Sequence, residues 1–328
     1  MKPILLVGGA GYIGTVLTEY LLSNQHSVKC IDNLAYEQYN SLKFFLNNKN
    51  YEFFNADIRN INSIKEYFNE IDAVVLLAGI VGDPISKKYP EITTDVNLKG
   101  VYNVINVCEE KKIERLIYIS TCSNYGITDI NKIADENHVL KPLSLYSKTK
   151  VEIEKFLINL NKKNNLKPTI LRFATAFGLS PRMRFDLTVS EFTKQLALDN
   201  ELVVYDPNTW RPYCHTKDFA NFIYKVINAK IDDVAFEIFN VGDNKNNFTK
   251  KMIVDQILEF FPNGKIKYLS QGFDARDYRV NFSKIKSKFG FTAQYSLKEG
   301  IIELIKEIEK KKFNFENDNL YGNYKLIS

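Results

Sequence analysis

The segment YSKTK places Tyr146 and Lys150 four residues apart, so on a helix the two side chains share one face. A lysine ammonium beside a phenol favours the phenolate and lowers the tyrosine pKa, which makes a general base usable near neutral pH. The spacing alone also suits an exposed aromatic residue on a charged helix. Thr121, however, follows the apolar run LIYIS at a predicted strand end. Together the three side chains indicate a site for general base catalysis.

A group of glycines precedes the first predicted helix. The stretch VGGAGYIG places Gly8, Gly11 and Gly14 directly after an apolar strand. Glycines there let a dinucleotide pyrophosphate approach the N–H groups of a helix N-terminus, although glycines also mark ordinary turns. Asp32 ends the second predicted strand and can accept hydrogen bonds from ribose hydroxyls, or begin a turn. Because a carboxylate repels a 2′-phosphate and no arginine follows closely, we expect NAD rather than NADP. Asp57 suits an adenine contact or a turn cap.

Short apolar segments alternate with helical periodicity through the first half of the chain. The predicted strands are 3–9, 27–33, 51–57, 71–79, 115–123 and 166–174, with a first helix at 12–24. This pattern predicts an α/β fold, a doubly wound parallel Rossmann sheet, with ligands beyond the carboxyl ends of its strands. The domains we expect are a cofactor domain at 1–174 with part of 211–242 returning to it, a smaller interwoven α/β substrate domain at 175–312 and a tail at 313–328.

Composition excludes several classes of protein. The 328 residues are 45% hydrophobic and 25% charged, and the net charge of +5 comes from scattered lysines, so we expect no nucleic-acid partner. No apolar run approaches the roughly 20 residues that span a bilayer, so we expect no membrane partner. Four separated cysteines without a CxxC pair predict reduced thiols in a cytoplasmic protein. Three histidines in unrelated contexts predict no metal site.

The order of the motifs carries a family resemblance. GGAGYIG, LLAG, DVNLKGVYNV, STCSNYG, YSKTK and RPYCHTKDFA occur in that order. With them the chain resembles an extended short-chain dehydrogenase/reductase of the nucleotide-sugar epimerase/dehydratase family over nearly its whole length, to YRVNFSKIKSKFGF. Val7 stands where many relatives carry threonine, and Thr175 stands at the usual asparagine position. The second departure bears on sugar binding.

The resemblance implies roles for single residues. Thr121 would hydrogen-bond the reacting sugar hydroxyl, Tyr146 would take its proton, and Lys150 would bind the nicotinamide ribose. Asn97 would orient the active-site helix. The implied cofactor contacts, with tightly bound NAD, are Gly8, Gly11, Tyr12, Ile13, Gly14, Asp32, Asn33, Asp57, Ile58, Leu77, Ala78, Gly79, Asn97, Tyr146, Lys150 and Phe173. The implied reaction is hydride transfer between sugar C4 and the nicotinamide ring.

The two residues that directly follow Thr121 limit which reactions of the family are expected. In the 4,6-dehydratases that this chain resembles, these positions are usually Asp and Glu, which serve in the loss of water. Here they are Cys122 and Ser123, which make a poor acid/base pair at neutral pH. The 3,5-epimerising reductases use a cysteine one position later and a histidine that GLSPRMRFD does not offer. Simple redox chemistry at C4 remains, and we interpret Cys122 as a packing residue.

A nucleotide-diphospho-sugar needs cationic donors, and guanidinium groups suit phosphate oxygens. The expected substrate contacts are Arg182, Arg184, Arg211 and Arg276, with Val81, Ser123, Asn124 and Thr175; loop arginines are also often just solvated. AGIVGDP and RMRFDLTV resemble the GDP-D-glycero-D-manno-heptose C4 dehydrogenases among surface-polysaccharide sugar enzymes. We therefore favour a C4 dehydrogenase acting on a GDP-sugar, with a UDP-hexose C4 epimerase and a catalytically silent NAD-binding protein as alternatives.

The resemblance also implies a homodimer. Relatives commonly pack two helices of each subunit into a four-helix bundle. The candidates are the helices that carry VNLKGVYNVINVCEE and YSKTKVEIEKFLINL. The second has a wide apolar stripe, which could instead face its own sheet.

Overall fold

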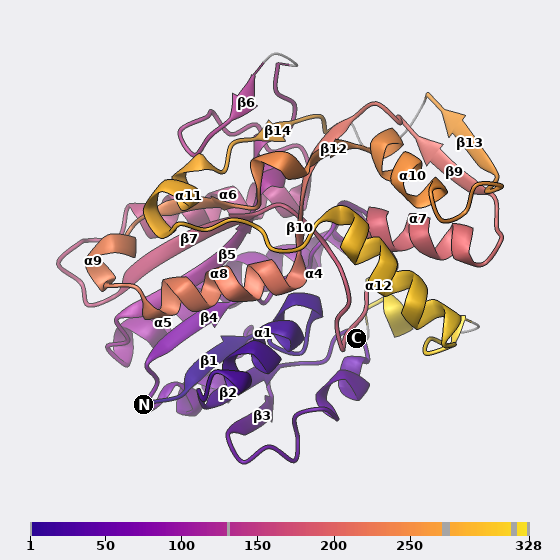
Figure 1. The fold of residues 1–328 in the computed structure, drawn as a ribbon. Coiled ribbons are helices and arrows are strands. Elements are labelled where there is room, and N and C mark those ends of the chain that lie inside the picture. Colours follow the sequence, from indigo (N-terminus) through magenta and orange to yellow (C-terminus); the bar gives the residue numbers. More distant parts are fainter. Residues whose placement is uncertain (1, 130–131, 271–275, 316–319, 327–328) are drawn as a thin grey trace.

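The computed structural model describes residues 2–129, 132–270, 276–315 and 320–326 (Figure 1). Its central sheet is built from β1 (Ile4–Val7), β2 (Val28–Asp32), β3 (Tyr51–Asn55), β4 (Ala73–Leu76), β5 (Arg115–Thr121), β7 (Lys167–Phe173) and β11 (Ile238–Val241). All neighbouring strands are parallel, in the order β11-β7-β5-β4-β1-β2-β3. The predicted doubly wound parallel sheet is confirmed.

Both faces of this sheet are buried. Successive strand residues point to opposite faces, so Ile4 and Leu6 pack in one apolar cluster while Leu5 and Val7 pack in another. The first face is covered by α1 (Tyr12–Ser23), α8 (Thr216–Asn228) and α11 (Ser283–Phe289), and the second by α2 (Ile61–Ile64), α5 (Val101–Glu110) and α6 (Leu145–Ile158). Burial on both faces explains why the strands are continuous apolar runs in the sequence.

The second half of the chain contributes to this sheet and also builds a smaller unit beside it. Strand β11 lies next to β7, with Ile238 opposite Ile170. Beyond the sheet lie β8 (Thr175–Phe177), β10 (Trp210–His215) and β12 (Asn247–Thr249), and the pairs β9 (Leu202–Tyr205) with β13 (Ile266–Leu269) and β6 (Ile133–Ala134) with β14 (Arg279–Val280). Helices α7 (Thr188–Ala197), α10 (Lys250–Leu258) and α12 (Leu297–Glu309) pack around a third apolar cluster (Figure 1). The short helices are α3 (Asp83–Lys88), α4 (Pro90–Thr94) and α9 (Ile231–Val234).

The described part of the tail bridges the two halves. The ring of Phe185 makes edge contacts with Phe313 and Tyr321, at 5.0 and 6.1 Å between ring centres, and its backbone N–H donates to the Tyr321 carbonyl at 2.7 Å. On the other side, the Asn323 amide donates to the Val81 carbonyl at 3.3 Å. The tail therefore joins the loop after β4 to the segment before α7.

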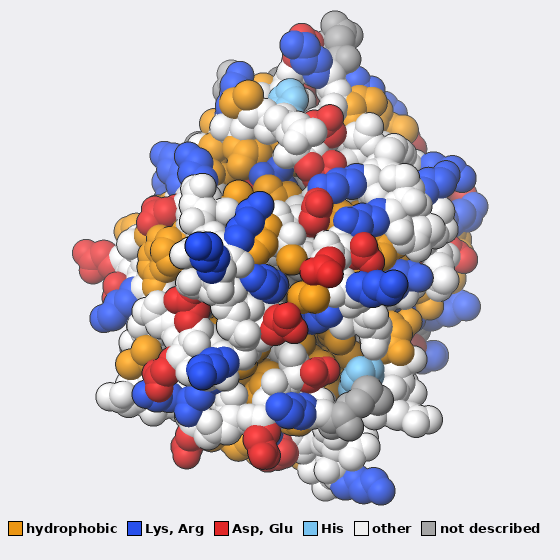
Figure 2. Space-filling model, turned by 90° about the vertical axis from the view of Figure 1, so that its left-hand side faces the viewer, with side chains coloured by type: hydrophobic (Ala, Val, Ile, Leu, Met, Phe, Trp, Pro, Cys, Tyr) orange, Lys and Arg blue, Asp and Glu red, His pale blue; other side chains and the backbone are white. Residues whose placement is uncertain are grey.

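The surface carries mixed charge. On the face shown in Figure 2, basic and acidic side chains are interspersed rather than gathered by sign. Within the described residues, no helix is long and apolar enough to cross a membrane. Over the same residues, no group of three His, Cys, Asp or Glu side chains could hold a metal ion. The four cysteines are buried and free.

Candidate active site

The catalytic candidates meet at the carboxyl edge of the sheet. Thr121 ends β5, and α6 begins after Ser144, which caps it. The Ser144 hydroxyl accepts from the Ser147 N–H at 3.2 Å, and the Ser147 hydroxyl accepts from the Ser144 N–H at 3.1 Å. This reciprocal pair satisfies two backbone donors and fixes the first turn of the helix. That turn carries Tyr146.

Tyr146 is buried, and the Thr121 hydroxyl is a neighbour that acts on its pKa. Burial raises the pKa of the Tyr146 phenol well above its usual range, and the Thr121 hydroxyl opposes this shift. The charge of Asp83 raises the pKa further, whereas Arg184 and Arg276 lower it. The predicted contact between strand end and helix is present, and three charged groups from other segments also face the phenol.

Lys150 lies beneath this pair and is 3% exposed. Its ammonium donates to the Ile119 carbonyl at 2.8 Å and lies 4.7 Å from the centre of the Tyr118 ring and 5.9 Å from that of Tyr146. Burial lowers the Lys150 pKa to about 8, opposed by the charge of Glu154. The expectation that Lys150 lowers the Tyr146 pKa below its ordinary value is wrong in this structure, because burial of the phenol dominates.

The glycine loop is shaped for close approach. Gly8 has φ +85°, and a Cβ there would lie 2.5 Å from the Ala78 nitrogen. A Cβ on Gly14 would lie 2.6 Å from the Gly9 carbonyl oxygen, whereas one on Gly11 would meet nothing closer than 3.5 Å. Gly11 also precedes α1 without a side-chain cap. The N-terminus of α1 thus presents backbone N–H groups where a pyrophosphate would bind.

Asp32 is held at the end of β2. Its carboxylate accepts from the backbone N–H groups of Ala10 and Leu34, at 3.1 and 2.9 Å, and from the Gln38 amide at 3.1 Å. Burial raises the Asp32 pKa, and these backbone hydrogen bonds and the Arg182 charge oppose the shift. The carboxylate is therefore placed beside the glycine loop, as a ribose ligand would need to be.

Asp57, after β3, has partners within the chain. Arg59 binds its carboxylate through two nitrogens, at 3.0 and 2.6 Å to Oδ2, and Asn33 donates to the same oxygen at 3.1 Å. Burial raises the Asp57 pKa, but the bonds from Arg59 hold it below its usual range. The arrangement suits a turn cap as well as an adenine contact. Ile58 is buried against Gly100.

The loop after β4 completes the cofactor edge. The N–H groups of Leu77 and Ala78 both donate to the Val7 carbonyl at 2.8 Å. Asn97, in a π-helical turn at Asp95–Gly100, accepts from the Ile80 N–H at 2.7 Å and donates to the Ile80 carbonyl at 3.1 Å. The same amide reaches Thr149 of α6 at 3.3 Å. Asn97 thus ties this loop, including neighbouring Gly79, to the helix that carries the catalytic candidates.

Several predicted side chains pack inside the protein instead. The Tyr12 hydroxyl donates to the Gly178 carbonyl at 2.5 Å, in the third apolar cluster, and Ile13 packs beside it. Phe173 stacks on Phe219 with 4.0 Å between ring centres. Asn124 is fully buried and donates to Glu154 at 2.9 Å. The Tyr12 hydroxyl and the Asn124 side-chain N–H groups therefore bond within the core, whereas the buried Asn124 Oδ1 has no hydrogen-bond partner among the described residues.

Two predicted arginines approach the phenol, each with a carboxylate partner. Arg184 binds Asp186 at 2.5 and 3.0 Å. Arg276 donates to the Ser123 hydroxyl at 3.0 Å and pairs with Asp83 at 3.4 Å. Ser123 thus lies beside Arg276, and its contact with a substrate stays a prediction.

The other two arginines lie further along the same edge. Arg182 is buried, donates to the Gly322 carbonyl at 3.1 Å and lies over the Tyr36 ring at 5.3 Å. Burial lowers its pKa to about 10, together with the charge of Arg184. Arg211 lies over the Tyr278 ring at 5.1 Å. Half-buried Thr175 begins β8 and pairs with Tyr213.

Cys122 is a packing residue, as interpreted from the sequence. Its thiol is 1% exposed and donates to the Arg172 carbonyl at 3.3 Å. Burial raises the Cys122 pKa well above its usual range, which removes thiolate character.

Sequence reasoning missed three charged residues near the site. Asp83 faces Tyr146 from the start of α3, and its only signal was its place after a predicted strand end. Glu154 and Arg172 form a buried ion pair below β5. Arg172 interrupts an apolar strand, and a charge buried in a strand requires a partner.

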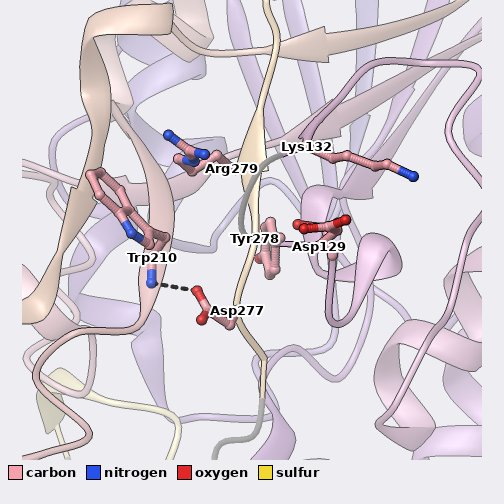
Figure 3. A pocket seen from close by; sticks show the side chains of 7 residues that line it. Asp129, Lys132, Trp210, Asp277, Tyr278 and Arg279 are labelled. Carbon is pink, nitrogen blue, oxygen red and sulfur yellow. Dashed lines mark hydrogen bonds between the residues drawn. The ribbon is translucent and has the colours of Figure 1, made fainter.

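A small cavity near the site is not the active site. Trp210, Asp277 and Arg279 line it, and the Trp210 N–H donates to Asp277 at 2.8 Å (Figure 3). Its volume of about 10 Å³ has room for about one water molecule, too little for a sugar or a dinucleotide.

Comparison with known proteins agrees with this geometry. Residues 4–242 match the NAD dependent epimerase/dehydratase family. The chain is 28% identical to a UDP-glucuronate 4-epimerase of Thermodesulfobacterium geofontis, over 94% of this chain and 100% of that one. Its fold matches the UDP-glucuronic acid 4-epimerase of Bacillus cereus (TM-score 0.86, 24% identity, 94% and 99% of the chains) and the UDP-glucose 4-epimerase of Thermotoga maritima (TM-score 0.84, 23% identity, 95% and 100%). The chain therefore belongs to the NAD dependent epimerase/dehydratase family, and NAD is its cofactor.

Proposed function

We propose that the protein oxidises C4 of the sugar in a nucleotide-diphospho-sugar, with Tyr146 as the general base. The observation that carries this proposal is the buried phenol of Tyr146: the Thr121 hydroxyl at the end of β5 lowers its pKa, and the ammonium of buried Lys150 lies 5.9 Å from its ring centre. The geometry suits a hydroxyl group that donates to the phenolate while Thr121 holds it in place.

The residues of the chain divide the work. Tyr146 accepts the proton from the C4 hydroxyl, and NAD, when bound, supplies the hydride acceptor. The pKa of Tyr146 is raised by burial, so the phenolate is a strong base once formed. Arg184 and Arg276 favour that phenolate, and Asp83 opposes it. Gly8, Gly11 and Asp32 would hold the dinucleotide, as the glycine cradle and the placed carboxylate suggest.

Two assignments of the sugar and the nucleotide base fit the proposed reaction. The motifs AGIVGDP and RMRFDLTV favour a GDP-heptose or a related surface-polysaccharide sugar, oxidised at C4 by a dehydrogenase. The relative named as a UDP-glucuronate 4-epimerase favours a second assignment, in which a UDP-sugar is oxidised, turned and reduced again as its C4 epimer. Both use Thr121, Tyr146 and Lys150.

One experiment distinguishes the dehydrogenase from the epimerase. Absorbance at the reduced-nicotinamide band is recorded for the purified protein with NAD, before and after adding GDP-, UDP- and dTDP-hexoses and a GDP-heptose. A band that rises with one sugar and persists indicates a dehydrogenase that needs an external oxidant. A band that returns to its start while a C4 epimer accumulates indicates an epimerase. No turnover with any sugar would instead favour an NAD-binding protein without catalysis.

A pair of variants tests the base. Tyr146→Phe removes the hydroxyl and should lower kcat by about 10²-fold or more. Tyr224→Phe is the matched control, since this half-buried tyrosine of α8 packs on Tyr20 and His26, neither of which is a predicted site residue, and it should keep activity. Full activity of Tyr146→Phe on the true substrate would contradict the proposal.

We propose further that the protein is a homodimer that packs through α5 and α6. Of the apolar stripe on α6, Ile153 and Leu157 are buried against the sheet, whereas Phe156 is 38% exposed. Phe156 contacts Tyr102 of α5, with 5.0 Å between ring centres. Light scattering should give twice the chain mass for the wild type and the mass of one chain for Phe156→Glu. A monomeric wild type at micromolar concentration would contradict the proposed dimer.

A further inference from the structure

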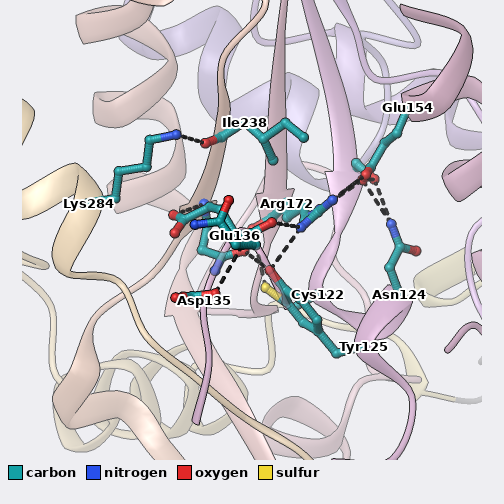
Figure 4. Close-up of polar contacts among 12 residues, drawn as sticks. Cys122, Asn124, Tyr125, Asp135, Glu136, Glu154, Arg172, Ile238 and Lys284 are labelled. Carbon is teal, nitrogen blue, oxygen red and sulfur yellow. Dashed lines mark hydrogen bonds and ion pairs between the residues drawn. The ribbon is translucent and has the colours of Figure 1, made fainter. Parts of the chain in front are cut away.

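A buried ion pair lies directly below the catalytic strand end. Arg172 of β7 binds Glu154 of α6 at 2.7 Å between Nη2 and Oε2, with further contacts from its Nε at 3.1 and 3.2 Å (Figure 4). The two side chains are 4% and 3% exposed. A pair so deeply buried is stable only when its remaining hydrogen-bonding capacity is also satisfied.

The remaining acceptor capacity of Glu154 joins α6 to β5 and to the turn that follows it. Ser120, next to Thr121, donates to Glu154 Oε1 at 2.5 Å, and Asn124 donates to the same oxygen at 2.9 Å. Ser120 and Arg172 lie opposite each other in the β5–β7 register, so one carboxylate spans both strands. The pair thus fixes the height of α6 over the end of β5.

The far side of Arg172 is also bound. Its Nη1 donates to the Tyr125 hydroxyl and to the Glu136 carbonyl, both at 3.0 Å, and Tyr125 donates to Asn240 of β11 at 2.7 Å. The arginine is therefore held from two sides and cannot swing away from Glu154 without leaving several polar groups unpaired.

Glu154 also lies on the catalytic face of α6. Tyr146, Lys150 and Glu154 follow one another at four-residue spacing, so their side chains line one stripe of the helix. The other titratable groups around Lys150 are the phenols of Tyr118 on β5 and of Tyr146. The Glu154 carboxylate favours the protonated form of Lys150, whereas burial disfavours it.

We propose that Glu154 is a positioning residue for the reaction proposed above: it locks α6 to the strand end that carries Thr121 and sets the charge state of Lys150. Arg172 serves it by holding the carboxylate in one orientation in the core. The expected effect on kinetics rests on the proposed function, whereas the expected effect on the Lys150 titration does not.

The direct test measures that titration without substrate. The protein is labelled at lysine Cε with ¹³C, and the Lys150 signal is assigned by its loss in Lys150→Met. In the wild type, Lys150 should titrate near pH 8. Glu154→Gln removes the charge that favours the ammonium and leaves Arg172 facing it, so the midpoint should fall by about one pH unit or more.

The kinetic test should show a shift in the same direction as the titration. Activity that needs both the Tyr146 phenolate and the Lys150 ammonium rises with pH up to the Lys150 pKa and then levels off, because the Tyr146 pKa lies higher. This break in the kcat profile should move to lower pH in Glu154→Gln by the same amount. If the nucleotide-sugar proposal fails, there is no profile to measure, yet the titration still decides the role of Glu154.

Two further variants keep the test decisive. Glu154→Gln/Arg172→Met removes both charges and leaves no uncompensated ion if the single variant does not fold; Lys150 should then titrate between the single variant and the wild type. Tyr125→Phe removes two hydrogen bonds from the same network without changing charge, so the protein should be less stable with the Lys150 midpoint unmoved. A midpoint within about 0.3 pH unit of wild type in both Glu154 variants would overturn the proposal.

Discussion

Lys150 shows how a single residue serves function at the expense of stability. Burial lowers its pKa from 10.5 to about 8, so the folded chain binds this proton more weakly than the unfolded chain does. The penalty is fully present below pH 8 and fades as pH rises from 8 towards 10.5. A catalytic group held under such conditions is a place where substitution can stabilise the fold.

Replacing this side chain should therefore stabilise the protein. We expect Lys150→Met to raise the free energy of unfolding at pH 7 by roughly 1–3 kcal/mol, less what the lost bond to Ile119 contributed. The gain should shrink when urea unfolding is repeated at pH 9.5. Exposed Lys148 lies on the same helix, and Lys148→Met should change stability little at either pH. A less stable Lys150→Met at pH 7 would contradict this account.

Asp83 is the acidic residue that faces the general base. Its charge raises the Tyr146 pKa, so Asp83→Asn should lower that pKa and also release Arg276 towards the phenol. Ionisation of the Tyr146 phenol, assigned by its loss in Tyr146→Phe and followed by ultraviolet difference absorbance, should consequently begin at lower pH, by about 0.5–1 unit. Asp72→Asn, before β4 at the opposite edge of the sheet, is the control; an unmoved phenol titration in Asp83→Asn argues against the contact.

At the scale of elements, the loop between β1 and α1 contains glycines with different duties. A Cβ on Gly14 would collide with the backbone of Gly9, whereas a Cβ on Gly11 would meet only ordinary contacts. Gly14 is therefore required for packing of the helix against its own loop, and Gly11 is free to serve a ligand.

Substitution of Gly14 and of Gly11 should have different effects. Gly14→Ala should lower the free energy of unfolding by about 1–3 kcal/mol even without NAD, because the helix start must move. Gly11→Ala should change unfolding by less than about 0.5 kcal/mol while weakening NAD binding by tenfold or more. Thermal unfolding and calorimetric titration with NAD measure the two effects. Equal destabilisation by both substitutions would show that Gly11 is also structural.

At the scale of the whole molecule, the described part of the C-terminal segment connects the loop after β4 to the segment before α7. Besides the bonds from Phe185 and Asn323 already described, Arg182 donates to the Gly322 carbonyl and Lys88 to the Tyr324 carbonyl at 3.3 Å. Arg182 lies within reach of the Asp32 charge as well. Loosening the tail should therefore loosen the edge on which the substrate is expected to lie.

Tyr321→Ala tests this connection. Loss of its ring from the cluster with Phe185 should lower stability by about 1–3 kcal/mol and raise the KM for the sugar substrate, with little change in NAD affinity. The ring of Tyr324 is 38% exposed, so Tyr324→Ala is the matched control and should leave the KM unchanged. A fall in NAD affinity with an unaltered KM would place the effect of the tail elsewhere.

Local features of the sequence were sufficient for much of this protein. Continuous apolar runs predicted the parallel sheet because both of its faces are buried, and the structure confirms this fold class. Six short motifs in a fixed order carried the resemblance to the family, which the comparison confirms. Such features depend on periodicity and short-range spacing, which the chain displays before it folds.

Tertiary structure alone decided how distant groups combine. Glu154 and Arg172 belong to different elements, and periodicity says that each is buried without saying that they meet. The same holds for Asp83 and Arg276, which reach Tyr146 from opposite halves of the chain. The predicted low pKa of Tyr146 was wrong for this reason: spacing places a lysine near the phenol, but the pKa depends on burial and on every charge that the fold brings to it.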